Sequence, residues 1–386
     1  MKRCILLLLC LWPLLSVGEI LDIGIYRDLA VQRALVTPFM GTYEVFGDGK
    51  LIAKFEANDG LRISTDGDKV ALRTISKNHG SYHRVEFLRK SWGSIFRIQP
   101  TVPEGREGKY NDNLVVSVEK GRLELINRVY IEYYVAGVVE AESGSKQNSE
   151  YYKLQSIVCR TYALNNMRRH EEEGFHLCDQ VHCQVYHGMS RFNELIPKAV
   201  TETKGLVVVD SDINLITASF HSNCGGQTIN AEDVWSMPLP YLQSVRDTFC
   251  LNGKHAEWET CIPRENWLNY LKKRHGYPVE NKRMAEKATK FNSQEQREIY
   301  YAAGDSGIPL KVIRQDWKLK STYFRVEPVQ DTIRISGRGF GHGVGMCQEG
   351  AMRMAEVGFT YSEIIQYYYT GVHLIDLSVL DFFREY

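Results

Sequence analysis

The stretch "YVAGVVEAESGS" (Tyr134–Ser145) marks the point at which the character of the chain changes. It is apolar and rich in small residues until it reaches two carboxylates, Glu140 and Glu142. In a helix, residues at i, i+3, i+4 and i+7 share a face, and Glu142 then continues a stripe of three valines. These valines are Val135, Val138 and Val139. Glu140 points to another side of the same helix.

Glu142 is therefore a candidate proton donor. A carboxyl group among valines loses solvation of its charged form, which raises its pKa toward the range where it can donate a proton at neutral pH. The alternative is a strand or a helix end at which Glu142 is capped or exposed, and the spacing alone leaves this alternative open.

The segment before this stretch, from about Leu21 to Tyr130, alternates short β-rich runs with turn signals. In "YEVFGDGKLIAKF" the sequence Gly-Asp-Gly separates two strand-like runs, and "LVVSVEKGRLELIN" repeats the pattern around Lys120-Gly121. Glycine-containing turns between alternating apolar runs are typical of β-hairpins. We expect a β-sheet or a small barrel here.

The segment after the opening stretch has helical and mixed character. "SEYYKLQSIVCRTYALNNMRRHEEE", which starts at Ser149 as a capping residue, predicts an amphipathic helix of about 25 residues. Strands are expected at "GLVVVD" and "LITASFHS", and helices at "NWLNYLKKRH", "SQEQREIYYAAG" and "YSEIIQYYYTG". The predicted class is α+β, with a central mixed α/β catalytic body, a long helix after the Glu142 motif and a β-rich N-terminal portion. The inward face of the long helix is expected to carry Leu154, Ile157, Val158 and Thr161.

Composition narrows the class of protein. With 386 residues, 44% of them hydrophobic, the chain is long enough for a substantial core. Basic and acidic residues both number 47, so no charge excess favours non-specific binding to nucleic acid or to an anionic membrane. A binding partner that is uncharged, or that carries charges of both signs, fits this balance better.

The N-terminal residues "MKRCILLLLCLWPLLSVGE" predict a signal peptide over residues 1–18. Two basic residues precede an apolar run, and Ser16-Val17-Gly18 offers the small-x-small pattern of a cleavage site. The run is about half of the roughly 20 residues needed to span a bilayer, which disfavours an uncleaved anchor. We expect export to the periplasm or cell envelope.

Cysteine usage leaves two interpretations open. Of nine cysteines, Cys4 and Cys10 would leave with the signal peptide, so the odd number that remains leaves at least one unpaired. In an exported protein, the pairs Cys250/Cys261 and Cys178/Cys183 are disulfide candidates. The second pair lies in "HEEEGFHLCDQVHCQVYHG", where thiols and imidazoles together also make a zinc ligand set.

Several motifs between about Ile126 and Leu377 occur in an order that resembles one family. They are "YVAGVVEAE", "CRTYAL", "CDQVHCQVY", "FHSNCGG", "PYLQSVRD" and "GRGFGHGVGMCQEGAMRMAEVG". This part of the chain resembles stage II sporulation protein D and its amidase-enhancer relatives. The expected organisation is a signal peptide (1–18), a β-rich region (19–125), a catalytic domain (126–378) and a short tail (379–386).

The resemblance implies a lytic transglycosylase that acts on peptidoglycan, with Glu142 as its single acid/base. Such an enzyme cuts the bond between N-acetylmuramic acid and N-acetylglucosamine without water and leaves a 1,6-anhydro end. Expected partners are peptidoglycan glycan strands denuded of stem peptides, together with a wall amidase that removes those peptides, in cell division or other wall remodelling. The alternative is a non-catalytic peptidoglycan-binding or amidase-enhancing module.

The resemblance also implies roles for further residues. Arg160 would orient Glu142 or hold a substrate carboxylate, against the alternative of a solvated helix arginine. Substrate-binding roles fall on His221, Ser222, Tyr241, Arg246, His342 and Gln348. A zinc ion would be held by Cys178, Cys183 and either His170 or His176, although a disulfide remains the alternative. The glycine-rich "GRGFGHGVGMCQ" lacks the Lys-Ser/Thr of a phosphate-binding loop, so no nucleotide is expected.

This chain departs from the family at one place beside the acid. The family continues the motif with Met-Pro, whereas this chain has Ser143-Gly144, which loosens the turn that follows Glu142.

Overall fold

The computed structural model describes residues 19–57, 59–190, 193–292, 297–301 and 307–379. The chain forms two compact units, one ending at Tyr134 and the other beginning at Val135. The predicted signal peptide (1–18) and most of the predicted tail lie outside the described residues. Within the described ranges, no helix is both long and apolar enough to cross a membrane.

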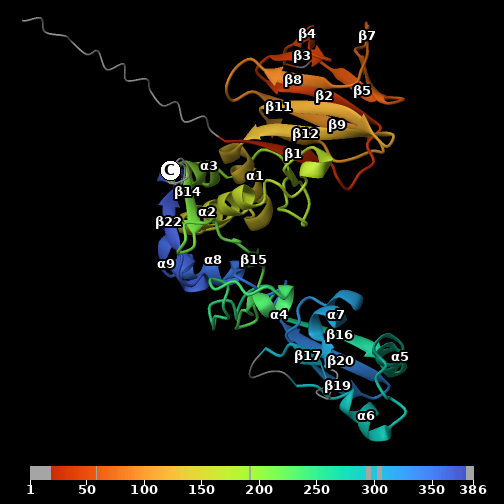
Figure 1. Cartoon of the computed structure of the whole chain (residues 1–386), viewed down its shortest axis with the longest axis vertical. Helices are drawn as coiled ribbons and strands as arrows, with labels where there is room; N and C mark the ends of the chain where they lie inside the picture. Colours follow the sequence, from red (N-terminus) through yellow and green to blue (C-terminus); the bar gives the residue numbers. More distant parts are fainter. Residues whose placement is uncertain (1–18, 58, 191–192, 293–296, 302–306, 380–386) are drawn as a thin grey trace, which may run out of the picture. The chain divides into compact units, whose positions relative to one another are not determined.

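The first unit contains two antiparallel sheets, visible as stacked strands in Figure 1. Its core is shared by the two sheets, since the ring of Tyr43 on one sheet packs edge-on against Phe96 on the other, with centroids 6.2 Å apart. One sheet has the order β1 (Ile20–Ile25), β12 (Arg122–Tyr130), β11 (Asn113–Glu119), β8 (Val85–Arg89), β3 (Tyr43–Gly47), β4 (Lys50–Phe55). The other has the order β10 (Gly108–Asn111), β9 (Ile95–Val102), β2 (Arg33–Met40), β5 (Leu61–Asp66), β6 (Lys69–Arg73), β7 (Asn78–Tyr82).

The two predicted hairpins are confirmed. β3 and β4 are joined through Asp48 and Gly49, with φ values of 47° and 78°, and β11 and β12 through Lys120 and Gly121, with φ values of 50° and 76°. Two consecutive residues with positive φ give a turn whose twist matches that of the flanking strands. The β-rich N-terminal portion of the predicted α+β class is therefore present.

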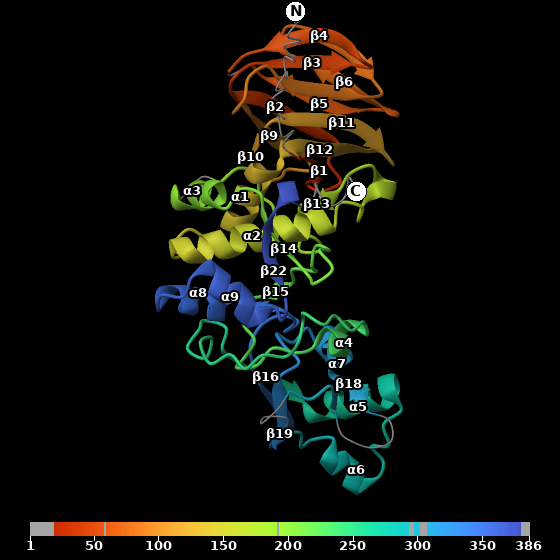
Figure 2. The ribbon, with the colours of Figure 1, turned by 60° about the vertical axis from the view of Figure 1, so that its left-hand side comes forward.

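The second unit is built around helix α2 (Ser149–Asn165), which contacts helices and a strand on several sides. Its predicted inward residues Leu154, Ile157, Val158 and Thr161 are all fully buried. Figures 1 and 2 show α2 beside β14 and above α8 and α9. The elements are α1 (Ile131–Ser143), α3 (Leu195–Glu202), β14 (Leu206–Val209), which pairs with β22 (His373–Asp376), α8 (Gln348–Glu356) and α9 (Tyr361–Tyr368).

Helix α2 is shorter than the predicted 25 residues. It begins after Asn148, whose side chain accepts a 2.8 Å hydrogen bond from the Glu150 amide, so the cap precedes Ser149. It ends at Asn165, because the Asn166 side chain donates back to the Tyr162 carbonyl. Asparagine side chains compete with the backbone ladder in this way and favour helix ends. The charged residues beyond form turns and η1 (Glu171–Glu173).

The remainder of this unit includes a three-stranded antiparallel sheet with its own apolar cluster around Trp267. Helix α5 confirms the helix predicted at "NWLNYLKKRH". The helix predicted at Ser293–Gly304 lies partly outside the described residues, and the described part is not helical, because Tyr300 and Tyr301 form strand β17. These elements are β16 (Glu257–Pro263), β20 (Thr332–Arg338), β19 (Phe324–Val329), α5 (Arg264–His275), α6 (Lys282–Lys287), α7 (Leu310–Asp316), β17 (Tyr300–Tyr301) and β18 (Ile308–Pro309).

One short parallel pair brings together two motifs that are distant in sequence. β15 (Phe220–His221) lies beside β21 (Met346–Cys347), so that "FHSNCGG" and "GRGFGHGVGMCQ" become neighbours. Glycine permits this approach: a Cβ at Gly345 would lie 2.2 Å from the Ser219 carbonyl oxygen. The remaining short elements are β13 (Leu177–Cys178) and α4 (Ala231–Trp235).

Candidate functional site

Glu142 lies in the last turn of α1, on the predicted valine face. Val135, Val138 and Val139 are fully buried, and Glu142 extends the same face to the wall of a cavity. Gly144 then adopts a left-handed conformation with φ of 69°, and its amide donates a 3.0 Å hydrogen bond to the Glu140 carbonyl. Gly144 thus ends the helix, whose last residue is Ser143.

The surroundings of Glu142 favour its protonated form. Burial raises the pKa of Glu142, and a hydrogen bond from the Val185 amide to Glu142 Oε1, 2.9 Å long, offsets part of this rise. A carboxyl group that is partly removed from water and held by a single amide is suited to donate a proton.

Two cavities meet at Glu142. One has a volume of about 780 Å³ and the other about 550 Å³. Glu142, Ser222 and Gln348 line both of them. Of the described residues that line the larger cavity, Glu142 alone carries a carboxylate, while Arg169 and Arg314 contribute positive charge. A chain-like ligand could extend to either side of Glu142.

His221 and Gln348 present buried polar atoms to the cavity. The Nδ1–H of His221 donates to the Val344 carbonyl at 3.1 Å, and its Nε2 has no hydrogen-bond partner among the described residues. The Nε2 of Gln348 is likewise buried without a partner in the described part of the chain. Burial holds the pKa of His221 well below its ordinary value. The neutral His221 therefore offers an acceptor, and Gln348 a donor, to hydroxyl or amide groups of a ligand.

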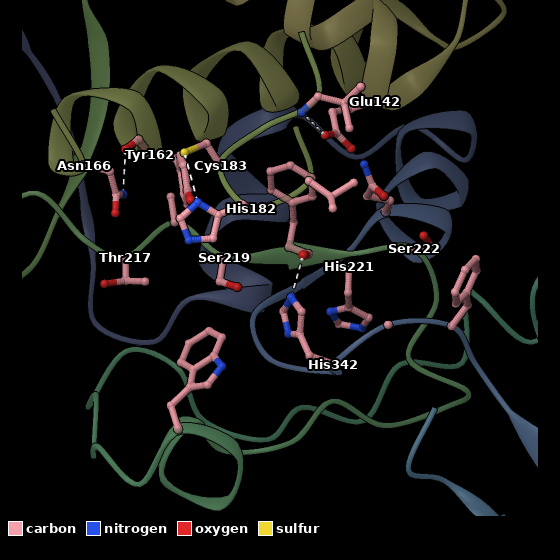
Figure 3. Close-up of a pocket in the computed structure, with 18 of the residues that line it drawn as sticks. Glu142, Tyr162, Asn166, His182, Cys183, Thr217, Ser219, His221, Ser222 and His342 are labelled. Atoms are coloured by element: carbon pink, nitrogen blue, oxygen red, sulfur yellow. Dashed lines mark hydrogen bonds between the residues drawn. The ribbon is translucent and has the colours of Figure 1, made fainter. Parts of the chain in front are cut away.

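His342 is fixed in one neutral tautomer across the cavity from Glu142 (Figure 3). Its Nε2–H donates to the Phe220 carbonyl at 2.9 Å, and its Nδ1 accepts from the Val344 amide at 3.1 Å. Burial lowers the pKa of His342 to about 4. Both ring nitrogens are thus occupied, and the ring face packs against Trp235 with centroids 5.5 Å apart. His342 shapes the cavity wall.

Three predicted site residues lie away from these cavities. Arg160 is fully buried rather than solvated or open to a cleft, and its Nη1 donates to the Leu206 carbonyl of β14 at 3.0 Å. The hydroxyl of Tyr241 accepts from the Thr217 amide at 3.1 Å within the core. Arg246 is exposed and lines neither cavity. The structure brings His221, Ser222, His342 and Gln348 to Glu142, but not these three.

Other carboxylates near the site are already engaged. Glu140 accepts a 2.7 Å hydrogen bond from the Ser190 hydroxyl and lines neither cavity. Glu349, at the second cavity, lies 2.5 Å from His255 Nδ1 and accepts from Asn223 Nδ2 at 2.7 Å. Glu356, which also lines the second cavity, is paired with Arg353 Nη1 at 3.1 Å. Each carboxylate other than Glu142 among the described residues that line the cavities is therefore engaged by another side chain, and none is free to act in a paired mechanism.

A group of thiols and imidazoles lies beside the larger cavity. The ligand atoms of His170, Cys178, His182 and Cys183 all lie within 4.8 Å of one another, and both cysteines are free thiols rather than a disulfide. The thiol pair shares a proton, which lowers the pKa of Cys178 to about 4 and raises that of Cys183. Of the two histidines predicted as alternatives, His170 belongs to the group and His176 does not; His182 belongs to it and was not predicted.

The donor set fits a zinc ion. Two sulfurs and two imidazole nitrogens are a usual tetrahedral zinc set. The Nε2 of His170 faces Cys183 Sγ at 3.4 Å, while its Nδ1 lies 2.5 Å from a Glu173 carboxylate oxygen. A carboxylate behind a ligating histidine fixes its tautomer and orientation.

Sequence reasoning missed several residues that line the cavities. Trp235 and Phe340 are exposed to 40% and 38%, which leaves aromatic faces at the rim of the larger cavity. Arg169 and Arg314 add positive charge there, and Glu349 lies in the second cavity. Glu349 directly follows the predicted Gln348 in the glycine-rich motif. Phe340 stands in the same glycine-rich motif, two residues before the predicted His342. Arg169, Trp235 and Arg314 stand in segments with no local pattern that could have identified them.

The sequence matches one family model and is similar to several known proteins. The model of a family described as stage II sporulation protein matches residues 119–209. An uncharacterized protein of Brachyspira hyodysenteriae is 30% identical over 273 residues, covering 70% of each chain. Stage II sporulation protein D of Bacillus subtilis is 29% identical over 84% of this chain and 90% of its own. The amidase enhancer of the same organism is 28% identical over 62% of this chain and 40% of its own. Since the family model matches and these relatives are similar over most of the chain, the chain belongs to the family of stage II sporulation protein D.

Proposed function

We propose that the protein is an exported lytic transglycosylase that cleaves the glycan strands of peptidoglycan between N-acetylmuramic acid and N-acetylglucosamine. The observation that carries the proposal is Glu142 itself: a carboxyl group with a raised pKa that lies where two cavities meet, without a free carboxylate partner among their described lining residues. A glycan strand must be bound on both sides of the bond to be cut, and this arrangement offers space on both sides.

One carboxyl group suffices for the chemistry. Protonated Glu142 gives its proton to the glycosidic oxygen as the bond to the anomeric carbon breaks, and the sugar passes through an oxocarbenium-like state. The resulting carboxylate then takes the proton of the sugar's own C6 hydroxyl as that oxygen bonds to the anomeric carbon. The 1,6-anhydro ring forms, Glu142 is protonated again and no water is consumed. A hydrolase would require a second carboxylate to activate water or to form a covalent intermediate.

The other cavity residues suit a sugar ligand. His221 Nε2 and Gln348 Nε2 are buried and free of partners in the described residues, so that they are available to hydroxyl and acetamido groups. Trp235 and Phe340 offer exposed rings against which sugar faces pack. Arg169 and Arg314 suit the lactyl carboxylate of N-acetylmuramic acid, which is freely accessible in strands without stem peptides. A wall amidase is the partner that would supply such strands.

We also propose that His170, Cys178, His182 and Cys183 hold a zinc ion with a structural role. Bound there, zinc would supply a cross-link within the loop that continues to Val185, whose amide contacts Glu142. The proton transfers remain with Glu142.

The test is incubation of the mature protein with purified glycan strands, with and without stem peptides, followed by mass spectrometry. We expect 1,6-anhydro ends from the wild type and a loss of about 10²- to 10⁴-fold in rate for Glu142→Gln. Glu140→Gln is the matched control, because Glu140 lies two residues before Glu142 on α1 and lines neither cavity. This variant should cleave glycan at the rate of the wild type. New reducing ends without anhydro sugars would indicate hydrolysis instead.

The competing function is a non-catalytic module that binds peptidoglycan or enhances an amidase. It is favoured by the 28% identity to a protein named amidase enhancer. Binding to glycan that stays uncut by both the wild type and Glu142→Gln would support this alternative and overturn the catalytic proposal.

A further inference from the structure

A second group of metal-ligating side chains lies apart from the His170 group and is entirely buried. Its ligand atoms belong to Cys224, Asp247, Cys250 and Cys347, and all lie within 4.8 Å of one another. They come from three separate segments: the "SNCGG" loop (Cys224), the segment Asp247–Cys250 that begins with the last residue of "PYLQSVRD", and the end of β21 (Cys347). None of the three cysteines is in a disulfide.

The spacing of the sulfurs suits a tetrahedral ion. Zinc lies about 2.3 Å from a thiolate sulfur, so two sulfurs on one tetrahedron are about 3.8 Å apart. Cys224 Sγ lies 3.4 Å from Cys250 Sγ and 3.3 Å from an Asp247 carboxylate oxygen. Small side-chain movements would bring all four atoms to bonding distance, and four protein ligands make the closed type of site that is structural rather than catalytic.

Two of the ligands, Cys347 and Asp247, also accept hydrogen bonds from groups outside the set, as metal ligands usually do. Cys347 Sγ accepts from the Cys224 amide at 3.2 Å and from the Gly350 amide at 3.4 Å, in the first turn of α8. Asp247 accepts from the Tyr368 hydroxyl at 2.9 Å and from the Phe249 amide at 2.9 Å. Amides and a hydroxyl aimed at sulfur and carboxylate oxygen stabilise negative charge at these atoms.

Two further features fit a charged centre at this place. Gly350 leaves room for it, since a Cβ there would lie 2.2 Å from an Asp247 carboxylate oxygen. Arg297 interacts electrostatically with Cys224 and Cys347, and its buried guanidinium has no hydrogen-bond partner in the described part of the chain. Three thiolates, one carboxylate and a divalent cation carry a net negative charge, which a buried arginine would offset.

We propose that Cys224, Cys250, Cys347 and Asp247 form a buried structural zinc site. This site fixes the walls of the Glu142 cavities: Cys224 follows the cavity residue Ser222 by two positions, and Cys347 directly precedes Gln348. The metal–ligand bonds would hold together the short β15–β21 pair, which brings these residues to the cavities. The inference stands independently of whether Glu142 cuts glycan.

The test separates this site from the His170 group by using the variant Cys178→Ser/Cys183→Ser of the mature chain, which leaves the proposed ligands intact. After purification in zinc, elemental analysis should find one zinc per folded chain. After exchange for cobalt(II), the near-ultraviolet thiolate-to-cobalt band should have the intensity of three sulfur ligands. Adding Cys224→Ser and Cys250→Ser should remove both signals, whereas Cys261→Ser, at an exposed cysteine outside the group, should leave them unchanged.

Two results would overturn the proposal. One is a folded Cys178→Ser/Cys183→Ser chain that contains no zinc and gives no thiolate-to-cobalt band. The other is a Cys224–Cys250 disulfide, detected by mass spectrometry after alkylation of the denatured, unreduced protein. Both readouts use a variant that keeps the four ligands, so they remain decisive even if the ligand substitutions prevent folding.

Discussion

The Val185 amide donates a 2.9 Å hydrogen bond to Glu142 Oε1, and among the described residues this is the only hydrogen bond to the carboxyl group. One carboxyl oxygen is thereby held in place, while the other remains available at the junction of the two cavities. The bond favours the ionised form and burial favours the protonated form, with burial the stronger effect. The loop that carries Val185 therefore influences both the orientation and the proton affinity of the candidate acid.

The raised pKa of Glu142 predicts the pH dependence of activity. Only the protonated carboxyl can donate to the glycosidic oxygen, so the rate on glycan should fall about tenfold for each pH unit above the pKa of Glu142. Rates of anhydro-end formation at saturating glycan, measured across the pH range in which the protein stays folded, test this. A rate that instead rises with pH through this range would point to a carboxylate base.

The same pKa predicts the pH dependence of stability. Because the pKa of Glu142 is higher in the folded than in the unfolded chain, its stabilising contribution is complete below the unfolded value and is lost as pH rises through the folded value. Glu142→Gln cannot ionise, so its free energy of unfolding should gain on the wild type as pH rises. Urea unfolding at several pH values measures this difference, and Glu140→Gln should run parallel to the wild type.

Gly137 on α1 controls the position of the Val185 loop. A Cβ at this residue would lie 2.1 Å from the Gly188 carbonyl oxygen and 2.7 Å from the Tyr186 ring. Gly137→Ala should therefore push the loop away from α1, costing about 1–3 kcal/mol in the free energy of unfolding. Since a displacement of about 1 Å can cost about 10²-fold in rate, activity should fall by a similar factor.

A variant of the same helix that adds no atoms provides the comparison. Ala141→Gly weakens α1 by about 1 kcal/mol through helix propensity alone. It should lower stability while leaving the rate per folded molecule nearly unchanged. Equal losses of rate in Gly137→Ala and Ala141→Gly would contradict a specific role for loop position.

Arg160 is expected to matter for stability rather than for catalysis. It is fully buried and joins α2 to the carbonyl of Leu206 on β14. Arg160→Met leaves that carbonyl without its donor and should cost about 2–4 kcal/mol. The rate per folded molecule should remain close to that of the wild type, as measured by urea unfolding and glycan cleavage on the same preparation.

The exposed Arg168 near the end of the same segment serves as the control. Arg168→Met should change stability by no more than about 0.5 kcal/mol. A stable Arg160→Met protein with an activity loss like that of Glu142→Gln would restore the catalytic role that the family resemblance implies.

Local patterns in the sequence were sufficient for the features that depend on neighbouring residues. The turns at Asp48-Gly49 and Lys120-Gly121 need positive φ at two consecutive residues, which the residue types reveal. The valine face of α1 likewise follows from helical spacing alone, and it places Glu142 at a cavity wall. Such features require no knowledge of what packs against the element.

Features that depend on distant segments could not be derived in this way. Helix α2 is covered on several sides, so a residue off its apolar stripe, such as Arg160, is buried as fully as one on it. The group of Cys224, Cys250 and Cys347 exists only because β15 pairs with β21, more than a hundred residues later in the chain. Neither packing nor this pairing leaves a periodic trace in the sequence. Closeness in the sequence makes Cys250 and Cys261 a disulfide candidate, whereas both are free thiols in the structure.

His342 gives the last prediction, which concerns acid stability. Both ring nitrogens are engaged in the neutral form, and burial lowers the pKa of His342 to about 4, below its value in an unfolded chain. As pH falls from about 6.5 to about 4, the unfolded chain takes up a proton that the folded chain does not, so up to about 3 kcal/mol of stability is lost. His342→Gln lacks this proton uptake.

We expect the wild type to be the more stable protein at neutral pH. The difference in unfolding free energy between the two proteins should narrow steadily as pH falls from about 6.5 to about 4. Urea unfolding of both proteins measures the gap, and His373→Gln, at an exposed histidine of β22, is the control. Unfolding free energies that run parallel between the wild type and His342→Gln would mean that His342 is protonated in the fold, and hence that the Val344 amide does not donate to its Nδ1.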